Sequence, residues 1–122
     1  MSEPKVVVMG VCASGKTTLV AGLAEAGICA WNVPQEHSFV RRLWEKQHPT
    51  ANVIVLLDAS FETTVRRRPT IAYGPGLLDE QRRRLTPARE ACHLFLPTDG
   101  LNIDQVRQTV LDWLQAWKER SQ

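Results

Sequence analysis

The sequence predicts an α/β fold: a three-layer α/β/α domain around a small parallel sheet of about four strands. Short apolar runs rich in β-branched residues alternate along the chain with stretches of helical periodicity, which is typical of such sheets. The 122 residues suffice for one domain with a buried core, and they contain no visible repeat or linker. Hydrophobic residues make up 43% of the chain and the formal net charge is only +2, which excludes intrinsic disorder. We therefore expect residues 1–122 to form a single domain.

The first half of the chain predicts strands at residues 5–9, 28–33 and 52–57. The first and third are continuous apolar runs, as expected of central strands buried on both faces. Residues 16–26 have the apolar spacing of a helix. A second helix is predicted over residues 36–47, where apolar side chains recur at helical spacing: Phe39, Val40, Leu43 and Trp44.

The second half predicts two helical segments followed by a strand. Ser60 is suited to cap the start of a helix over residues 61–68. The next helical pattern covers residues 77–91, and Pro87 should kink that helix or split it in two. Residues 92–96 form another short apolar run, which we interpret as a buried strand.

The chain closes with a predicted amphipathic helix. Asn102 and Gln105 form a capping arrangement at its start. Trp113 and Trp117 widen its apolar face, so that one side of this helix is a candidate contact in a homo-oligomer. The apolar stripe itself consists of Ile103, Val106, Val110, Leu114 and Trp117.

A glycine-rich motif lies between the first predicted strand and the first predicted helix. Residues 10–17 fit the pattern G-x-x-x-x-G-K-[ST], whose backbone curls so that successive N–H groups converge on a phosphate. Lys16 would neutralise the β- and γ-phosphates, Thr17 would ligate Mg²⁺, and Thr18 would reach the α-phosphate. The alternative is a chance occurrence in another kind of strand-to-helix turn. The predicted nucleotide-binding residues are Gly10, Val11, Cys12, Ala13, Ser14, Gly15, Lys16, Thr17 and Thr18.

On this motif and two further segments, the chain resembles P-loop NTPases of the nucleoside and nucleotide kinase type. Residues 6–27 look like the first strand, loop and helix of such kinases. Residues 52–68 are similar to a later strand and its arginine-rich helix, and residues 93–114 to the final strand and helix. The resemblance implies a P-loop fold, ATP and Mg²⁺ as cofactors, phosphotransfer, and a lid-like segment over residues 61–90.

The sequence also departs from that family. No Asp-Arg pair ends a strand, and the stretch between Thr18 and Asn52 has no room for helices that clamp an acceptor nucleotide. The expected acceptor is therefore a small molecule of unknown identity. The guanine-reading motif Asn-Lys-x-Asp is also absent, which makes adenine the expected base.

Two carboxylates are candidates to act beside the phosphates. Asp58 ends an apolar strand, as a Walker B acid does, and would bind Mg²⁺; alternatively it caps the following turn with Ser60. Glu36 follows the second strand and belongs to the carboxyl edge of the sheet, where ligands of parallel sheets bind. It would orient a magnesium-bound water or act as a general base, or else it caps the next helix together with His37.

Arginines supply the remaining candidate groups. Those at residues 66–68 would point about 100° apart on a helix, so that only one or two of them can reach a phosphate. A second arginine triplet lies at residues 82–84. The turn between the two triplets, which contains Tyr73, would serve as a lid hinge. The alternative is a solvated basic face. The predicted catalytic residues are Lys16, Glu36, Arg66 and Arg68.

Three function hypotheses follow. The first is a cytoplasmic Mg·ATP-dependent phosphotransferase that acts on a small acceptor, or a slow ATPase. The second is a non-catalytic nucleotide-sensing module that alters a partner contact. The third, nucleic-acid binding by the arginine triplets, is disfavoured by the small net charge and by the lack of interleaved aromatic and basic residues.

Cysteine usage and hydropathy bear on the compartment. The three cysteines lie far apart without a C-x-x-C pair, which argues against a cysteine zinc site or a disulfide framework. No apolar run approaches the roughly 20 residues that span a bilayer, and the N-terminus lacks the pattern of a signal peptide. We therefore expect reduced thiols, a cytoplasmic location and no membrane partner.

Overall fold

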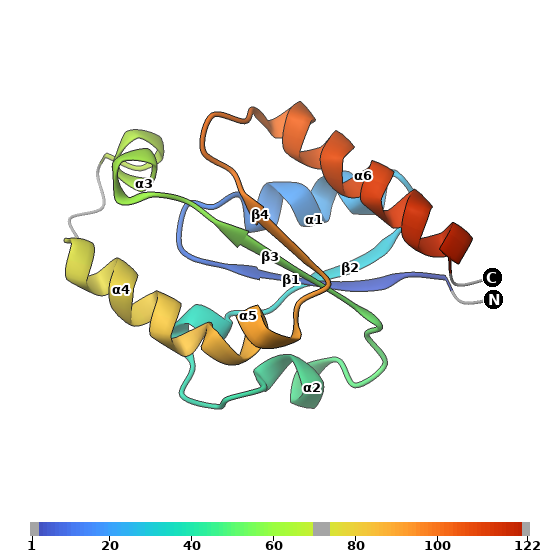
Figure 1. Ribbon diagram of the computed structural model, residues 1–122, viewed down its shortest axis with the longest axis horizontal. Coiled ribbons are helices and arrows are strands. Elements are labelled where there is room, and N and C mark those ends of the chain that lie inside the picture. The colour runs from blue at the N-terminus through green and yellow to red at the C-terminus, as the bar shows by residue number, and fades with distance from the viewer. Residues whose placement is uncertain (1–2, 70–73, 121–122) are drawn as a thin grey trace.

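The computed structural model describes residues 3–69 and 74–120 and has an α/β architecture (Figure 1). No helix within these ranges is both long and apolar enough to cross a membrane. The predicted α/β class is confirmed. Along the chain the elements are β1 (Lys5–Gly10), α1 (Lys16–Glu25), β2 (Cys29–Asn32), the 3-10 helix η1 (Gln35–His37), α2 (Leu43–Gln47), β3 (Val53–Asp58), α3 (Phe61–Arg67), α4 (Pro75–Arg84), α5 (Thr86–Ala91), β4 (Leu94–Pro97) and α6 (Ile103–Arg120).

The strands form one four-stranded parallel sheet, as predicted. Their order in the sheet is β2-β1-β3-β4. The two central strands pair from Val6 with Val53 to Gly10 with Leu57. Because all the strands run in the same direction, their carboxyl ends meet at one edge of the sheet. The turns that follow β1, β2, β3 and β4 therefore come together at that edge.

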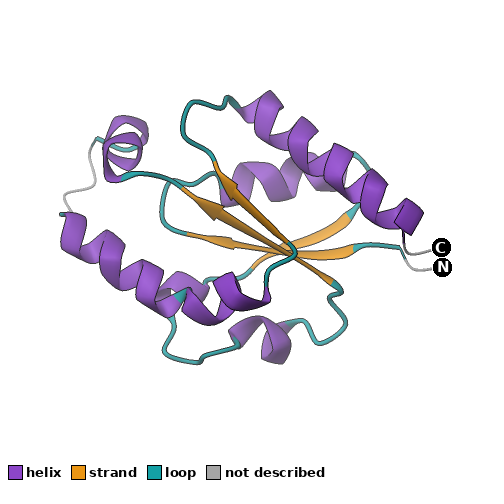
Figure 2. Ribbon diagram, in the orientation of Figure 1, coloured by secondary structure: helices purple, strands orange, loops and turns teal. Residues whose placement is uncertain are grey.

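Helices cover both faces of the sheet, and each face has its own buried core (Figure 2). On one face, Val6 and Val8 of β1 pack with apolar residues of α1 and α6. On the other, Val7 and Met9 pack with residues of α2, α4 and α5. This alternation along β1 follows from the two-residue period of a strand. The arrangement is compatible with a three-layer α/β/α fold.

The prediction of one helix over residues 36–47 is wrong. The chain there forms η1, an irregular turn and the short helix α2. The fully buried side chain of Gln35 explains the difference: its Nε2 donates to the Val40 carbonyl oxygen (2.7 Å) and its Oε1 accepts from the Leu43 N–H (2.9 Å). These bonds satisfy backbone groups that a helix would otherwise pair. Phe39 is consequently 85% exposed.

Three predictions about helix ends are confirmed. The Ser60 hydroxyl caps α3 by accepting from the Thr63 N–H (3.2 Å). Asn102 and Gln105 exchange two hydrogen bonds of 2.8 and 2.9 Å at the start of α6. Pro87 splits the predicted 77–91 helix, because α4 ends and α5 begins just before it.

Candidate functional site

The glycine-rich loop, residues 10–17, connects β1 to α1 in a tight curl. A Cβ on Gly10 would lie 2.5 Å from the Leu57 carbonyl oxygen and 2.7 Å from the Ser14 Oγ, so this position has no space for a side chain. Gly15 has a φ of 103°, in the left-handed region that side chains disfavour, and Ala13 also has a positive φ, 62°. Successive turns of this kind direct neighbouring N–H groups toward a common point.

The N-terminus of α1 is not capped. Its N-cap residue Gly15 has no side chain to accept a hydrogen bond, and no acidic residue lies in the first turn. Within the described part of the chain, no acceptor meets the backbone N–H groups of Gly15, Lys16, Thr17 and Thr18. Unpaired donors at a helix N-terminus, together with the helix dipole, make a binding position for an anion.

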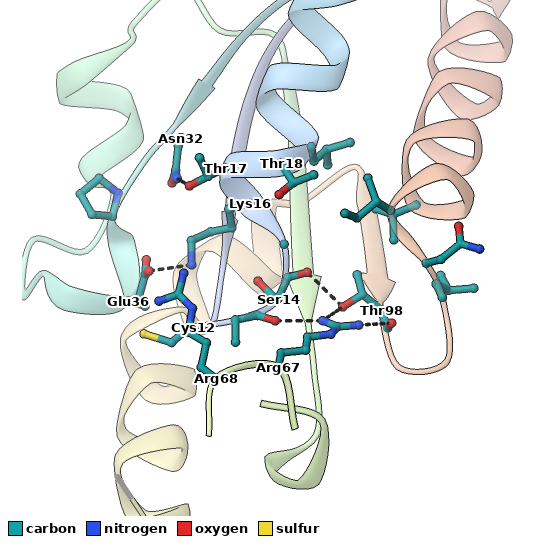
Figure 3. Close-up of a pocket in the computed structure, with 18 of the residues that line it drawn as sticks. Cys12, Ser14, Lys16, Thr17, Thr18, Asn32, Glu36, Arg67, Arg68 and Thr98 are labelled. Carbon is teal, nitrogen blue, oxygen red and sulfur yellow. Dashed lines mark hydrogen bonds and ion pairs between the residues drawn. The ribbon is translucent and has the colours of Figure 1, made fainter. Parts of the chain in front are cut away.

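These donors border a cavity of about 1120 Å³ at the carboxyl edge of the sheet (Figure 3). Besides the loop, its walls come from η1, the end of α3, and the segment that joins β4 to α6. Ile103, predicted for the core stripe of α6, is 65% exposed and lines this cavity. The volume of about 1120 Å³ is slightly larger than roughly 300–1,000 Å³, the range typical of small-molecule sites.

Lys16 and Glu36 form an ion pair inside the cavity, and Figure 3 shows their side chains directed toward each other. The Lys16 ammonium lies 2.7 Å from Glu36 Oε2 and donates to the carbonyl oxygens of Gly10 (2.9 Å) and Val11 (3.0 Å). Glu36 is only 3% exposed, and its Oε1 has no hydrogen-bond partner among the described residues. A buried carboxylate oxygen without a partner is costly, so a ligand or metal that met it would stabilise the site.

Of the arginine triplet on α3, Arg67 and Arg68 line the cavity. Arg67 Nη1 donates to the Ala13 carbonyl oxygen (2.8 Å) and to Thr98 Oγ1 (2.9 Å), and its Nη2 donates to the Thr98 carbonyl oxygen (2.7 Å). Arg66 does not line it and instead donates within its own helix. The arginines at the loop are therefore Arg67 and Arg68, whereas the sequence favoured Arg66 and Arg68.

Asp58 does not line this cavity. Its two carboxylate oxygens accept from Arg82 Nε (3.2 Å) and Nη2 (3.3 Å), and both residues line a separate cavity of about 250 Å³. The alternative role, capping the turn with Ser60, belongs to Asp99, which accepts from the Ser60 hydroxyl (2.7 Å). Of the two predicted carboxylates, only Glu36 lies at the glycine-rich loop.

Sequence reasoning missed two residues that hold the loop in place. Gln81 of α4 is 1% exposed, and its Oε1 accepts from the Cys12 N–H (2.9 Å) while its Nε2 donates to the Cys12 Sγ (3.0 Å). Thr98 donates from its hydroxyl to the Ser14 carbonyl oxygen (3.0 Å). No local signal could identify Gln81, because 69 residues separate it from Cys12. Thr98 belongs to a Thr-Asp-Gly turn that the family resemblance included without a role.

The remaining predicted residues have mixed outcomes. Thr17 and Thr18 line the cavity, and Asn32 Nδ2 donates to Thr17 Oγ1 (3.2 Å). Residues 70–73 of the predicted lid hinge, Tyr73 included, lie outside the described residues, and the last two hinge residues, Pro75 and Gly76, begin α4. Trp113 and Trp117 are partly buried against the core formed with α1, and their role in a homo-oligomer stays a prediction.

No protein-family model matches this chain, and a search of curated proteins found no significant match. The geometry of the loop and its cavity is therefore the basis for interpreting the function.

Proposed function

We propose that this chain is a kinase-like P-loop protein that binds the triphosphate of Mg·ATP with residues 10–18. One observation carries the proposal: the uncapped N-terminus of α1, with its unpaired N–H groups, borders a large cavity at the carboxyl edge of a parallel sheet. The left-handed Gly15 and the close approach of Gly10 to β3 support the same interpretation.

The charges around the cavity favour a polyanion. Lys16, Arg67 and Arg68 line it, against the carboxylates of Glu36 and Asp104. The Lys16 ammonium donates to two loop carbonyl oxygens, and a phosphate oxygen would be a stronger, charged acceptor. Lys16 therefore holds the phosphates, and Arg67 and Arg68 neutralise charge that develops on them.

Mg²⁺ fits the donor set at the loop. The Thr17 hydroxyl lines the cavity and would bind Mg²⁺ directly, whereas the Glu36 carboxylate would accept a hydrogen bond from a water bound to the ion. Bound Mg²⁺ would neutralise phosphate charge. Asp58 is the weaker candidate ligand, because Arg82 already pairs with its carboxylate.

We infer that the terminal phosphoryl group passes to a hydroxyl of a small acceptor, or slowly to water. The acceptor oxygen forms a bond to the γ-phosphorus, the bond from that phosphorus to the β–γ bridging oxygen breaks, and the acceptor proton moves to Glu36. A buried carboxylate facing the cavity suits this general-base role. Adenine remains the expected base.

Calorimetric titration with Mg·ATP tests the binding proposal. Lys16→Ala should weaken binding by about 1.5–3 kcal/mol, or roughly 10- to 150-fold in Kd, because charged hydrogen bonds to phosphate are lost. Lys46→Ala, at an exposed lysine on α2, removes the same charge away from the cavity and should bind as wild type does. Absence of binding to wild type at millimolar nucleotide, or equal affinity of Lys16→Ala, would overturn the proposal.

A non-catalytic nucleotide-sensing module is a second candidate function, and the contacts of α3 and α4 favour it. Arg67 and Gln81 bond directly to the glycine-rich loop, so phosphate binding there would be transmitted to both helices. Amide exchange across residues 61–69 and 74–91 should then slow when Mg·ATP binds, without release of phosphate. Phosphate release or transfer above the uncatalysed background would exclude this second function.

A further inference from the structure

Three side chains with metal-binding atoms meet at the rim of the cavity. Cys12 comes from the glycine-rich loop, whereas Glu36 and His37 come from η1. One ligand atom from each lies within 4.8 Å of the others. His37 Nε2 is 3.9 Å from Cys12 Sγ and 3.7 Å from Glu36 Oε2.

These separations are close to those in a tetrahedral metal centre. Zinc bonds of about 2.3 Å to sulfur and about 2.0–2.2 Å to nitrogen or oxygen place neighbouring ligand atoms roughly 3.4–3.6 Å apart. The distances from His37 Nε2 to Cys12 Sγ and to Glu36 Oε2 exceed these values by a few tenths of an ångström. The three ligand atoms together lie within 4.8 Å, so metal binding would also draw Cys12 and Glu36 closer to each other. His37 is partly exposed, with 57% of its side-chain surface accessible, and has room for this adjustment.

The buried carboxylate of Glu36 gives independent support. Its Oε1 has no hydrogen-bond partner within the described ranges, although the side chain is only 4% exposed. Oε2, the oxygen 3.7 Å from His37 Nε2, pairs with Lys16, and Oε1 of the same carboxylate is left for a metal ion. Gln81 Nε2 donates to the Cys12 sulfur (3.0 Å) and thereby helps to position this ligand atom.

We propose that Cys12, Glu36 and His37 bind one Zn²⁺-class ion. A thiolate, an imidazole and a carboxylate select borderline-soft divalent metals rather than Mg²⁺, which prefers oxygen ligands and retained waters. Three protein ligands leave one coordination position for water or an anion from the cavity. The short ligand spacings of zinc motifs do not reveal this cluster in the sequence. Cys12 and His37 lie 25 residues apart and meet only because η1 packs beside β1.

Titration of the tag-free protein with Co²⁺ in the absence of nucleotide tests this site. We expect saturation at one equivalent, with the near-ultraviolet sulfur-to-cobalt charge-transfer band and intense visible bands of a four-coordinate thiolate complex. Zn²⁺ at one equivalent should bleach both. Calorimetry with Zn²⁺ alone should give the same stoichiometry. Because no nucleotide is present, failure of this test leaves the ATP proposal intact.

Matched variants separate the proposed ligands from the other cysteines and histidines. Cys12→Ser should abolish the charge-transfer band, and His37→Gln should weaken Zn²⁺ binding at least about tenfold. Cys29→Ser, Cys92→Ser and His48→Gln should behave as wild type does, and circular dichroism checks that each variant folds. A band that survives Cys12→Ser, unchanged affinity in His37→Gln, or no binding of micromolar Co²⁺ and Zn²⁺ to wild type would overturn the proposal.

Discussion

The turns after the neighbouring strands β1 and β3 both lead into a helix at the same edge of the sheet, yet their hydrogen-bond donors are used in opposite ways. At α3, Ser60 caps the Thr63 N–H, and Asp99 accepts from the Ser60 N–H (2.9 Å) and hydroxyl as well as from Thr63. At α1, Gly15 provides no cap. The described residues thus pair the N–H groups at the start of α3 and leave those at the start of α1 unpaired.

The electrostatics of the two turns differ accordingly. The Thr63 hydroxyl, followed by the Ser60 hydroxyl and N–H, lowers the pKa of Asp99 from 3.8 to about 2. A negative charge is thus built into the α3 turn. The α1 turn has no acid in its first helical turn, and its own charged residue is the cation Lys16. The α1 turn therefore differs from the α3 turn in having N–H donors without acceptors among the described residues.

Closing the α1 turn with a side chain should have the largest effect. Gly10→Ala places a Cβ 2.5 Å from the Leu57 carbonyl oxygen, and backbone of a central strand cannot easily move. We expect the free energy of unfolding in urea to fall by about 2–3 kcal/mol.

Gly76→Ala is the matched control, because an added Cβ in that part of α4 meets nothing within 4 Å. It should leave stability unchanged or raise it by up to about 1 kcal/mol. Equal stabilities of wild type and Gly10→Ala would show that the loop is not pressed against β3.

Removing the link between the two turns should have an intermediate effect. Arg67→Ala deletes the hydrogen bonds from α3 to the Ala13 carbonyl oxygen and to Thr98. We expect the Kd for Mg·ATP in calorimetry to rise about tenfold, or roughly 1.4 kcal/mol. Arg66→Ala, one position earlier, should change the Kd less than about twofold, because Arg66 does not line the cavity and donates only within its own helix. A larger rise in Kd for Arg66→Ala than for Arg67→Ala would contradict this and favour the sequence-based choice of Arg66.

Removing the Asp99 charge from the turn that precedes α3 should have the smallest effect. The folded-state pKa of Asp99, about 2, lies below its ordinary 3.8, so the ionised form stabilises the fold at neutral pH. For this exposed residue we expect Asp99→Asn to lower the free energy of unfolding by about 1 kcal/mol at pH 7. The difference should shrink as the pH falls from about 4 toward 2, because protonation of Asp99 removes the same charge.

Urea titrations at pH 7, 4 and 3 measure this difference, with Asp79→Asn as an exposed control on α4. The affinity for Mg·ATP should not change in either variant. A stability difference that persists at low pH would mean that Asp99 acts through its shape and not through its charge.

Features set by neighbouring residues were determined by the sequence alone. The apolar runs fix the strands, Asn102 and Gln105 cap α6 across three residues, and Pro87 splits the α4–α5 segment. The glycine pattern at residues 10–17 likewise predicts a curled turn, because Gly10 and Gly15 occupy backbone positions that disfavour side chains. Such features depend on bonds a few residues long.

Only the tertiary structure decided which distant side chains serve the loop. Asp58 pairs with Arg82, 24 residues away, and is thereby separated from the cavity, whereas Glu36 reaches Lys16 because η1 packs beside β1. Arg67 reaches Ala13 across 54 residues, and Gln81 reaches Cys12 across 69. The physical reason is that the order of the strands, and not proximity in sequence, sets which turns meet at the carboxyl edge of the sheet.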